Sequence, residues 1–102
     1  MPLEVIYAPE ADKDLDHLFY FILPRSGHRV ALAYIERIEA FCKAFSIFPQ
    51  RGHARDDLSP GLRIVGFERR VTIAFHVEPE RVVIDRVLYG GRSLEGSLQP
   101  DS

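Results

Sequence analysis

Three arginines and one tyrosine in the C-terminal half of this 102-residue sequence are the side chains best suited to chemistry. The predicted strands place all four near one side of a small sheet, and they are Arg63, Arg70, Arg92 and Tyr89. Grouped cations could hold a phosphodiester and stabilise the charge that develops during its cleavage, while a tyrosine or histidine moves a proton. The alternative is a solvated arginine-rich face with local carboxylate partners such as Asp85. The residue types alone do not decide between these interpretations.

Other catalytic and metal-binding patterns have less support. The sequence has no P-loop, dinucleotide-binding loop, Gly-x-Ser-x-Gly elbow or paired cysteine ligands. Cys42 falls in the apolar stripe of a predicted helix, which indicates packing rather than nucleophilic attack. His53, Asp56 and Asp57 share a loop, but no second histidine or cysteine completes a metal shell there. We therefore expect no metal and no cofactor.

The strands that would position these residues are predicted between residues 61 and 92. The run from Val71 to Val77 alternates with a period of two, and the next run is rich in β-branched residues. With turns at residues 68–69 and 79–80, cross-strand pairing defines two faces. The expected core face contains Leu62, Ile64, Val71, Ile73, Phe75, Val77, Val82, Ile84, Leu88 and one charge, Arg86. The expected outer face contains Arg63, Val65, Phe67, Arg70, Thr72, Ala74, His76, Val83, Asp85, Val87 and Tyr89.

The N-terminal half predicts a short strand and two helices. The strand covers residues 3–7, and a first helix follows over residues 9–23, where Pro9 and early acidic residues suit a helix start. Pro24, Ser26 and Gly27 are expected to end it. A second helix is expected over residues 29–47. The fold class is therefore α+β, with an N-terminal strand, a helical hairpin and a three-stranded antiparallel meander in one small sheet.

The second predicted helix has a wider apolar arc than one sheet face requires. Its core stripe is flanked by Val30, Tyr34, Phe41 and Phe48. One interpretation is that the first helix covers the excess in the hairpin. The other is a docking groove for an amphipathic helix of a partner, extended by two aromatic residues of the first helix, Tyr20 and Phe21.

The composition is that of one globular domain, expected over residues 1–95, with a flexible tail at residues 96–102. The residues are 46% hydrophobic and 27% charged, with a net charge of −2. The pI near 6.1 lies well below the value of about 9 that is typical of domains binding DNA through their own field. A single cysteine and the lack of an apolar run of membrane-spanning length favour a reducing cytoplasm and no membrane association.

The order of the elements and several short motifs resemble the RelE/ParE superfamily of toxins from bacterial type II toxin–antitoxin systems. The resemblance covers residues 3–95. Its markers are Tyr7-x-Pro9-x-Ala11-x-x-Asp14-Leu15, Pro49-x-x-Gly52, Pro60-Gly61-Leu62-Arg63 and Arg86-Val87-Leu88-Tyr89-Gly90-Gly91-Arg92. The last motif is close to the usual ending of the ParE branch.

The two branches of this superfamily imply different functions. RelE-like members cleave mRNA on the ribosome with sheet cations and a tyrosine near the C-terminus. Along this chain that pattern keeps Arg63 and Arg92 but has Val65 and Thr72 at two cation positions, and its tyrosine falls at Leu98. ParE-like members are instead implied to bind and poison DNA gyrase without a catalytic constellation of their own. The departures favour the ParE branch.

The resemblance therefore implies a cytoplasmic ParE-like toxin that binds DNA gyrase and is neutralised by a ParD-like antitoxin. No cofactor and no sequence-specific DNA binding by this chain are expected. The residues expected to bind partners are Tyr34, Phe41, Phe48, Arg63 and Arg92. The first alternative is a metal-independent endoribonuclease using Arg63, Arg92, Arg70 and Tyr89. The second is a degenerate member that only binds an antitoxin.

Overall fold

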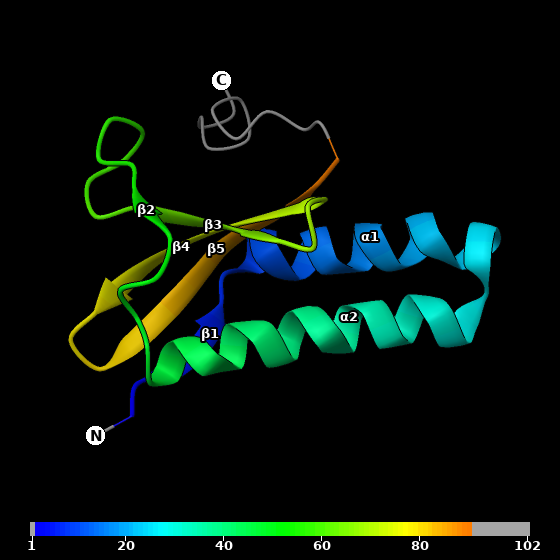
Figure 1. Ribbon diagram of the computed structural model, residues 1–102, viewed down its shortest axis with the longest axis horizontal. Coiled ribbons are helices and arrows are strands. Elements are labelled where there is room, and N and C mark those ends of the chain that lie inside the picture. Colours follow the sequence, from blue (N-terminus) through cyan, green and yellow to red (C-terminus); the bar gives the residue numbers. More distant parts are fainter. Residues whose placement is uncertain (1, 91–102) are drawn as a thin grey trace.

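A helical hairpin lies against a five-stranded sheet in the computed structural model, which describes residues 2–90 (Figure 1). The sheet order is β1-β5-β4-β3-β2, and only β1 and β5 pair in parallel. The elements are β1 (Glu4–Tyr7), α1 (Pro9–Ser26), α2 (His28–Lys43), η1 (Ala44–Ser46), β2 (His53–Ala54), β3 (Arg63–Phe67), β4 (Val71–Glu78) and β5 (Arg81–Tyr89). The α+β class is confirmed, and the predicted meander is extended by β1 on one edge and the short β2 on the other.

The hairpin turns at Gly27 rather than at Pro24. Pro24 lies inside the last turn of α1, where it removes only one late hydrogen bond, so the helix continues to Ser26. Gly27 has φ +90°, a conformation that favours glycine, and its N–H donates to the carbonyl of Leu23. The second helical segment agrees with the prediction more closely, because α2 passes directly into the 3-10 turn η1.

The pairing of β3 with β4 differs from the prediction by one residue. Phe67 pairs with Val71, and Val65 pairs with Ile73, because the turn contains three residues rather than two. Glu68 and Arg69 both have positive φ values in this turn. The shift brings Val65 and Phe67 to the core face and removes Ile64 and Leu62 from it, since a one-residue slip inverts every side chain of a strand.

A β-bulge changes the second half of β5. Phe75 pairs with Ile84, but Ala74 pairs with Arg86, so Asp85 is the extra residue. Beyond the bulge, Val87 lies opposite Ile73, and the next core position of β5 is Tyr89, opposite Val71. The expected placement of Arg86 and Leu88 on the core face, and of Val87 and Tyr89 on the outer face, is therefore wrong.

The main core lies between the hairpin and the corrected sheet face. As predicted, Ile73, Phe75 and Ile84 are fully buried beneath the helices. The rings of Phe45 and Phe75 lie 4.6 Å apart, centroid to centroid. Cys42 is also fully buried, and this burial raises the pKa of its thiol to about 11, which agrees with a packing role. The remaining members of the cluster are Ala11, Leu15, Leu18, Ile38, Phe67, Val71, Val82 and Val87.

Within the described residues, neither helix is long and apolar enough to cross a membrane.

Candidate functional site

Arg63, the first residue of β3, is held by the loop that follows η1. Its Nε donates to the carbonyl of Arg51 at 2.8 Å, and its Nη2 lies 3.2 Å and 3.3 Å from the carbonyls of Gln50 and Gly52. The guanidinium therefore closes the loop 50–52 against β3. Its Nε and Nη2 are thus engaged by backbone oxygens of this loop.

The other candidate residues of the phosphodiester site do not gather around Arg63. Tyr89 pairs with Val71 of β4, whereas Arg63 pairs with Phe75 of β4. These two positions of β4 are four residues apart, which is about 13 Å along the strand at a rise of about 3.3 Å per residue. Arg70 is exposed in the β3–β4 turn. Arg92 lies outside the described residues. Among the described residues, the structure thus brings Tyr89 near Arg70 but not near Arg63.

Tyr89 belongs to an aromatic cluster under the hairpin. Its ring lies 5.4 Å from that of Phe21 and 6.4 Å from that of Tyr34, centroid to centroid. Tyr34 also contacts Phe67, whose ring lies 5.0 Å from that of Phe41. Phe67 therefore packs against Tyr34 and Phe41, which accounts for part of the wide apolar arc of α2, while both side chains stay only partly buried.

Phe48, a residue of the predicted partner surface, is exposed. Its exposed fraction is 64%, and its neighbour Ile47 is 67% exposed. At the tip of the hairpin, four more large apolar residues are exposed, namely Tyr20, Phe21, Val30 and Leu32. Large exposed apolar patches are typical of contacts with other macromolecules, so these residues are the candidates for such a contact.

His76 forms the most concentrated ionisable cluster on the opposite side of the sheet. Its Nδ1 lies 2.7 Å from Asp85 Oδ2, and its Nε2 lies 3.0 Å from Glu78 Oε2. Burial opposes protonation of the imidazole, but the hydrogen bonds to both carboxylates raise the pKa of His76 above its ordinary value. Burial and the charges of Glu10 and Glu78 raise the pKa of Asp85, and these outweigh the opposing effect of His76. Asp85 is thus a carboxylate partner of His76, whereas one interpretation of the sequence expected it beside the arginines of this face.

Asp14 is a buried charge that the sequence analysis did not identify. It is 4% exposed and binds Arg86 with both carboxylate oxygens, at 2.8 Å and 2.9 Å. Its position offers a signal, because Asp14 falls within the apolar stripe formed by Ala11, Leu15 and Leu18. A carboxylate in such a stripe requires a partner in the core.

Comparisons with known proteins agree with this geometry. Residues 5–94 match the family model described as the ParE toxin of type II toxin-antitoxin system, parDE. The chain belongs to the ParE toxin family. It is 35% identical over 94 residues to Toxin ParE3 of Caulobacter vibrioides, a match that covers 92% of this chain and 93% of that protein.

The ParE fold is also found among solved structures. A chain of the chromosomal ParDE TA system from P. aeruginosa superposes with a TM-score of 0.75 at 22% identity. The match covers 86% of this chain and 96% of that chain.

One glycine of the motifs that suggested the family has a structural role in this fold. Gly52 has φ +70°, and a Cβ there would collide with the carbonyl oxygen of Ile64, so only glycine fits.

The two loop carboxylates considered as metal ligands have other partners: Asp57 forms a fork with Arg55, and Asp56 accepts the N–H of Gly61. These loop carboxylates are therefore engaged in structural contacts.

Proposed function

We propose that this ParE toxin inhibits growth by binding DNA gyrase and that a ParD-like antitoxin neutralises it, as in plasmid stabilisation modules. The observation that carries a binding function over RNA cleavage is the arrangement of Arg63, whose guanidinium donates to backbone carbonyls of the loop 50–52. A phosphodiester-cleaving site needs several cations directed at the reacting group, and each such contact is worth about 10²–10³ in rate.

The two substituted cation positions also support binding rather than cleavage. Val65 packs at the edge of the core, and Thr72 lies between core positions of β4. Neither side chain stabilises an oxyanion as a lysine or arginine would. Arg70, the third arginine of the candidate nuclease site, sits on an exposed turn, where a surface charge contributes to partner recognition more readily than to preorganised catalysis.

Two parallel assays test this function. Purified toxin is expected to inhibit gyrase supercoiling or to trap gyrase on DNA, and to leave ribosome-bound mRNA intact. Charge reversal at Arg92 is expected to weaken inhibition in a salt-dependent way, because surface charges guide association. Arg29→Glu, an equal charge change at the start of α2, is the control. Specific mRNA cleavage that Arg63→Ala abolishes, with gyrase unaffected, would assign the chain to the nuclease class instead.

The antitoxin is proposed to cover apolar surface at both ends of α2. Phe48 and the open edges of Tyr34 and Phe41 form one part of this surface, and the exposed residues at the hairpin tip form the other. Hydrogen exchange of the toxin alone and in complex is the test. Added protection over residues 30–48 is expected, and an unchanged pattern there would contradict the proposed surface.

A further inference from the structure

The turn between β3 and β4 presents two arginines that no carboxylate neutralises. Glu68, Arg69 and Arg70 form this turn, and all three are exposed. We call these three residues the arginine turn. Within the described part of the chain, neither Arg69 nor Arg70 makes an ion pair. By contrast, the arginines with carboxylate or carbonyl partners include Arg25, Arg37, Arg55, Arg63, Arg81 and Arg86.

The backbone of the arginine turn has an unfavourable conformation. Glu68 has φ +48° and Arg69 has φ +67°, in the left-handed region that residues with a side chain rarely occupy. Glycine or asparagine would adopt these angles at a lower cost. Strained conformations persist only where the surrounding structure holds them, and they cluster at functional sites. The strain therefore points to a role for the side chains that this turn presents.

Contacts at both ends fix the arginine turn to the fold. Arg37 of α2 donates two hydrogen bonds of 3.0 Å each to the carboxylate of Glu68, and these bonds lower the pKa of Glu68. At the other end, the carbonyl of Arg70 accepts the N–H of Gly90 at 2.8 Å. The acid of the turn is thus neutralised by α2, and the guanidinium groups of Arg69 and Arg70 are the charges that the turn offers to a partner.

The composition of the arginine turn suits phosphate groups better than a protein surface. A protein–protein interface has a core with few charges and many aromatic residues, whereas the three residues of this turn include no apolar side chain. Guanidinium groups bind phosphate oxygens with paired N–H donors, and contacts of this kind to a nucleic-acid backbone do not depend on the bases. Two neighbouring arginines on a fixed turn can therefore contact a phosphodiester backbone at two points.

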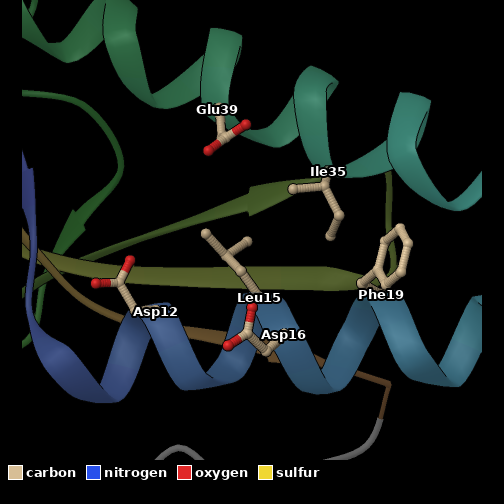
Figure 2. Close-up of a pocket in the computed structure, with 6 residues that line it drawn as sticks. All are labelled: Asp12, Leu15, Asp16, Phe19, Ile35 and Glu39. Atoms are coloured by element: carbon tan, nitrogen blue, oxygen red, sulfur yellow. The ribbon is translucent and has the colours of Figure 1, made fainter.

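The rest of the toxin does not attract DNA by itself. Its net charge is −2, and its pI is near 6.1. Between α1 and α2, a groove of about 440 Å³ is lined by three carboxylates, Asp12, Asp16 and Glu39, which repel phosphates (Figure 2). A contact between the arginine turn and DNA therefore requires a partner that holds both molecules.

We infer that the arginine turn contacts the phosphate backbone of the DNA that gyrase holds while the toxin is bound to the enzyme. The inference rests on the proposed function, because gyrase is what brings DNA to the toxin. Arg69 and Arg70 add affinity for the DNA-loaded enzyme without reading the base sequence. Each neutralised phosphate releases condensed counterions, so the DNA-dependent part of the affinity falls as the salt concentration rises.

The test measures toxin binding to gyrase with and without a short DNA duplex. The turn variant carries Arg69→Asn and Arg70→Gln, with asparagine at residue 69 because it tolerates a positive φ. The control variant carries Lys13→Gln and Lys43→Gln, an equal charge change at exposed positions outside the turn. DNA is expected to lower the Kd of the parent and of the control at least about tenfold at low salt, and that of the turn variant less than about threefold. On DNA-loaded gyrase, the slope of log K against log salt is expected to be shallower by about 2 for the turn variant.

The other outcomes separate this inference from the proposed function. If the turn variant loses affinity for gyrase alone by the same factor as for DNA-loaded gyrase, the arginines contact an acidic protein surface and the inference is wrong. Equal effects of DNA on the parent and on the turn variant, including no effect on either, would also overturn it. Failure of the unmodified toxin to bind gyrase in either form would overturn the proposed function itself. Thermal unfolding checks the fold, and both variants are expected to melt close to the parent because the substituted side chains are exposed.

Discussion

The carboxylate of Asp14 accepts hydrogen bonds from Arg86 at 2.8 Å and 2.9 Å, and its Oδ2 also accepts the backbone N–H of Val87 at 2.9 Å. These contacts join α1 to β5 across 72 positions of the sequence. They occur just past Ile84, where the pairing of β1 with β5 ends. Beyond the last residue of β5 that pairs with β1, Asp14 therefore holds the edge of β5 with side-chain hydrogen bonds.

Replacing Asp14 by alanine is expected to lower the free energy of unfolding by about 3–5 kcal/mol, because it leaves Arg86 without its buried carboxylate. Chemical denaturation measures the change. Glu36→Ala, on the exposed side of α2, is the control and is expected to stay within about 0.5 kcal/mol. A cost for Asp14→Ala as small as that of the control would show that the pair does not support the fold.

The corrected register of β3 is tested by two phenylalanines. Phe67→Ala is expected to cost about 3–5 kcal/mol, because Phe67 is 9% exposed and packs against Tyr34 and Phe41. Phe48→Ala, at a side chain that is 64% exposed, is expected to change stability by less than about 0.5 kcal/mol. Similar small effects at both positions would instead favour the register in which Phe67 faces outward.

Replacement of Arg63 is expected to lower the stability of the fold rather than to act directly on activity. Arg63→Ala removes a charged donor from the carbonyls of the loop 50–52, so we expect a loss of roughly 1–3 kcal/mol in the free energy of unfolding. Arg63→Lys keeps the charge but not the fork of donors and is expected to fall between alanine and arginine. Arg29→Ala serves as the exposed control. Full stability of Arg63→Ala with lost activity would indicate a direct functional contact.

The cluster of His76 predicts a pH-dependent stability. Its two carboxylate partners, Asp85 and Glu78, raise the folded-state pKa above the ordinary value of 6.5. Protonated His76 therefore stabilises the fold below about pH 6.5, and this contribution is lost as the pH rises through the folded pKa. Two further charges act on these partners: Glu10 raises the pKa of Asp85, and Arg81 forms an ion pair with Glu78 at 3.5 Å.

Unfolding free energies of the parent and of His76→Gln between pH 5.5 and 8.5 measure this contribution. The difference between the two proteins is expected to be largest at the acidic end and to shrink toward pH 8.5. His17→Gln, at an exposed position of α1, should show no such trend. A difference that grows with pH would mean that the cluster favours neutral histidine.

The elements of this protein follow from local patterns in the sequence. The alternation from Val71 to Val77 and the helical stripe containing Cys42 located β4 and α2, because each pattern repeats with the period of its own backbone. The same periodicity placed Ile73, Phe75 and Ile84 under the hairpin. The family also followed from the sequence, since its motifs lie in short contiguous segments, and the comparisons confirm it.

The tertiary structure decided which face of the sheet a strand residue occupies and which charged residues become partners. The inward position of Phe67 depends on a turn of three residues instead of two, and that of Val87 on one extra residue at Asp85. Local periodicity does not determine such single-residue shifts, because both registers preserve the alternation, and the burial gained against α2 and α1 selects between them. The Asp14–Arg86 pair arises in the same way, from a helix and a strand brought together only when the chain has folded.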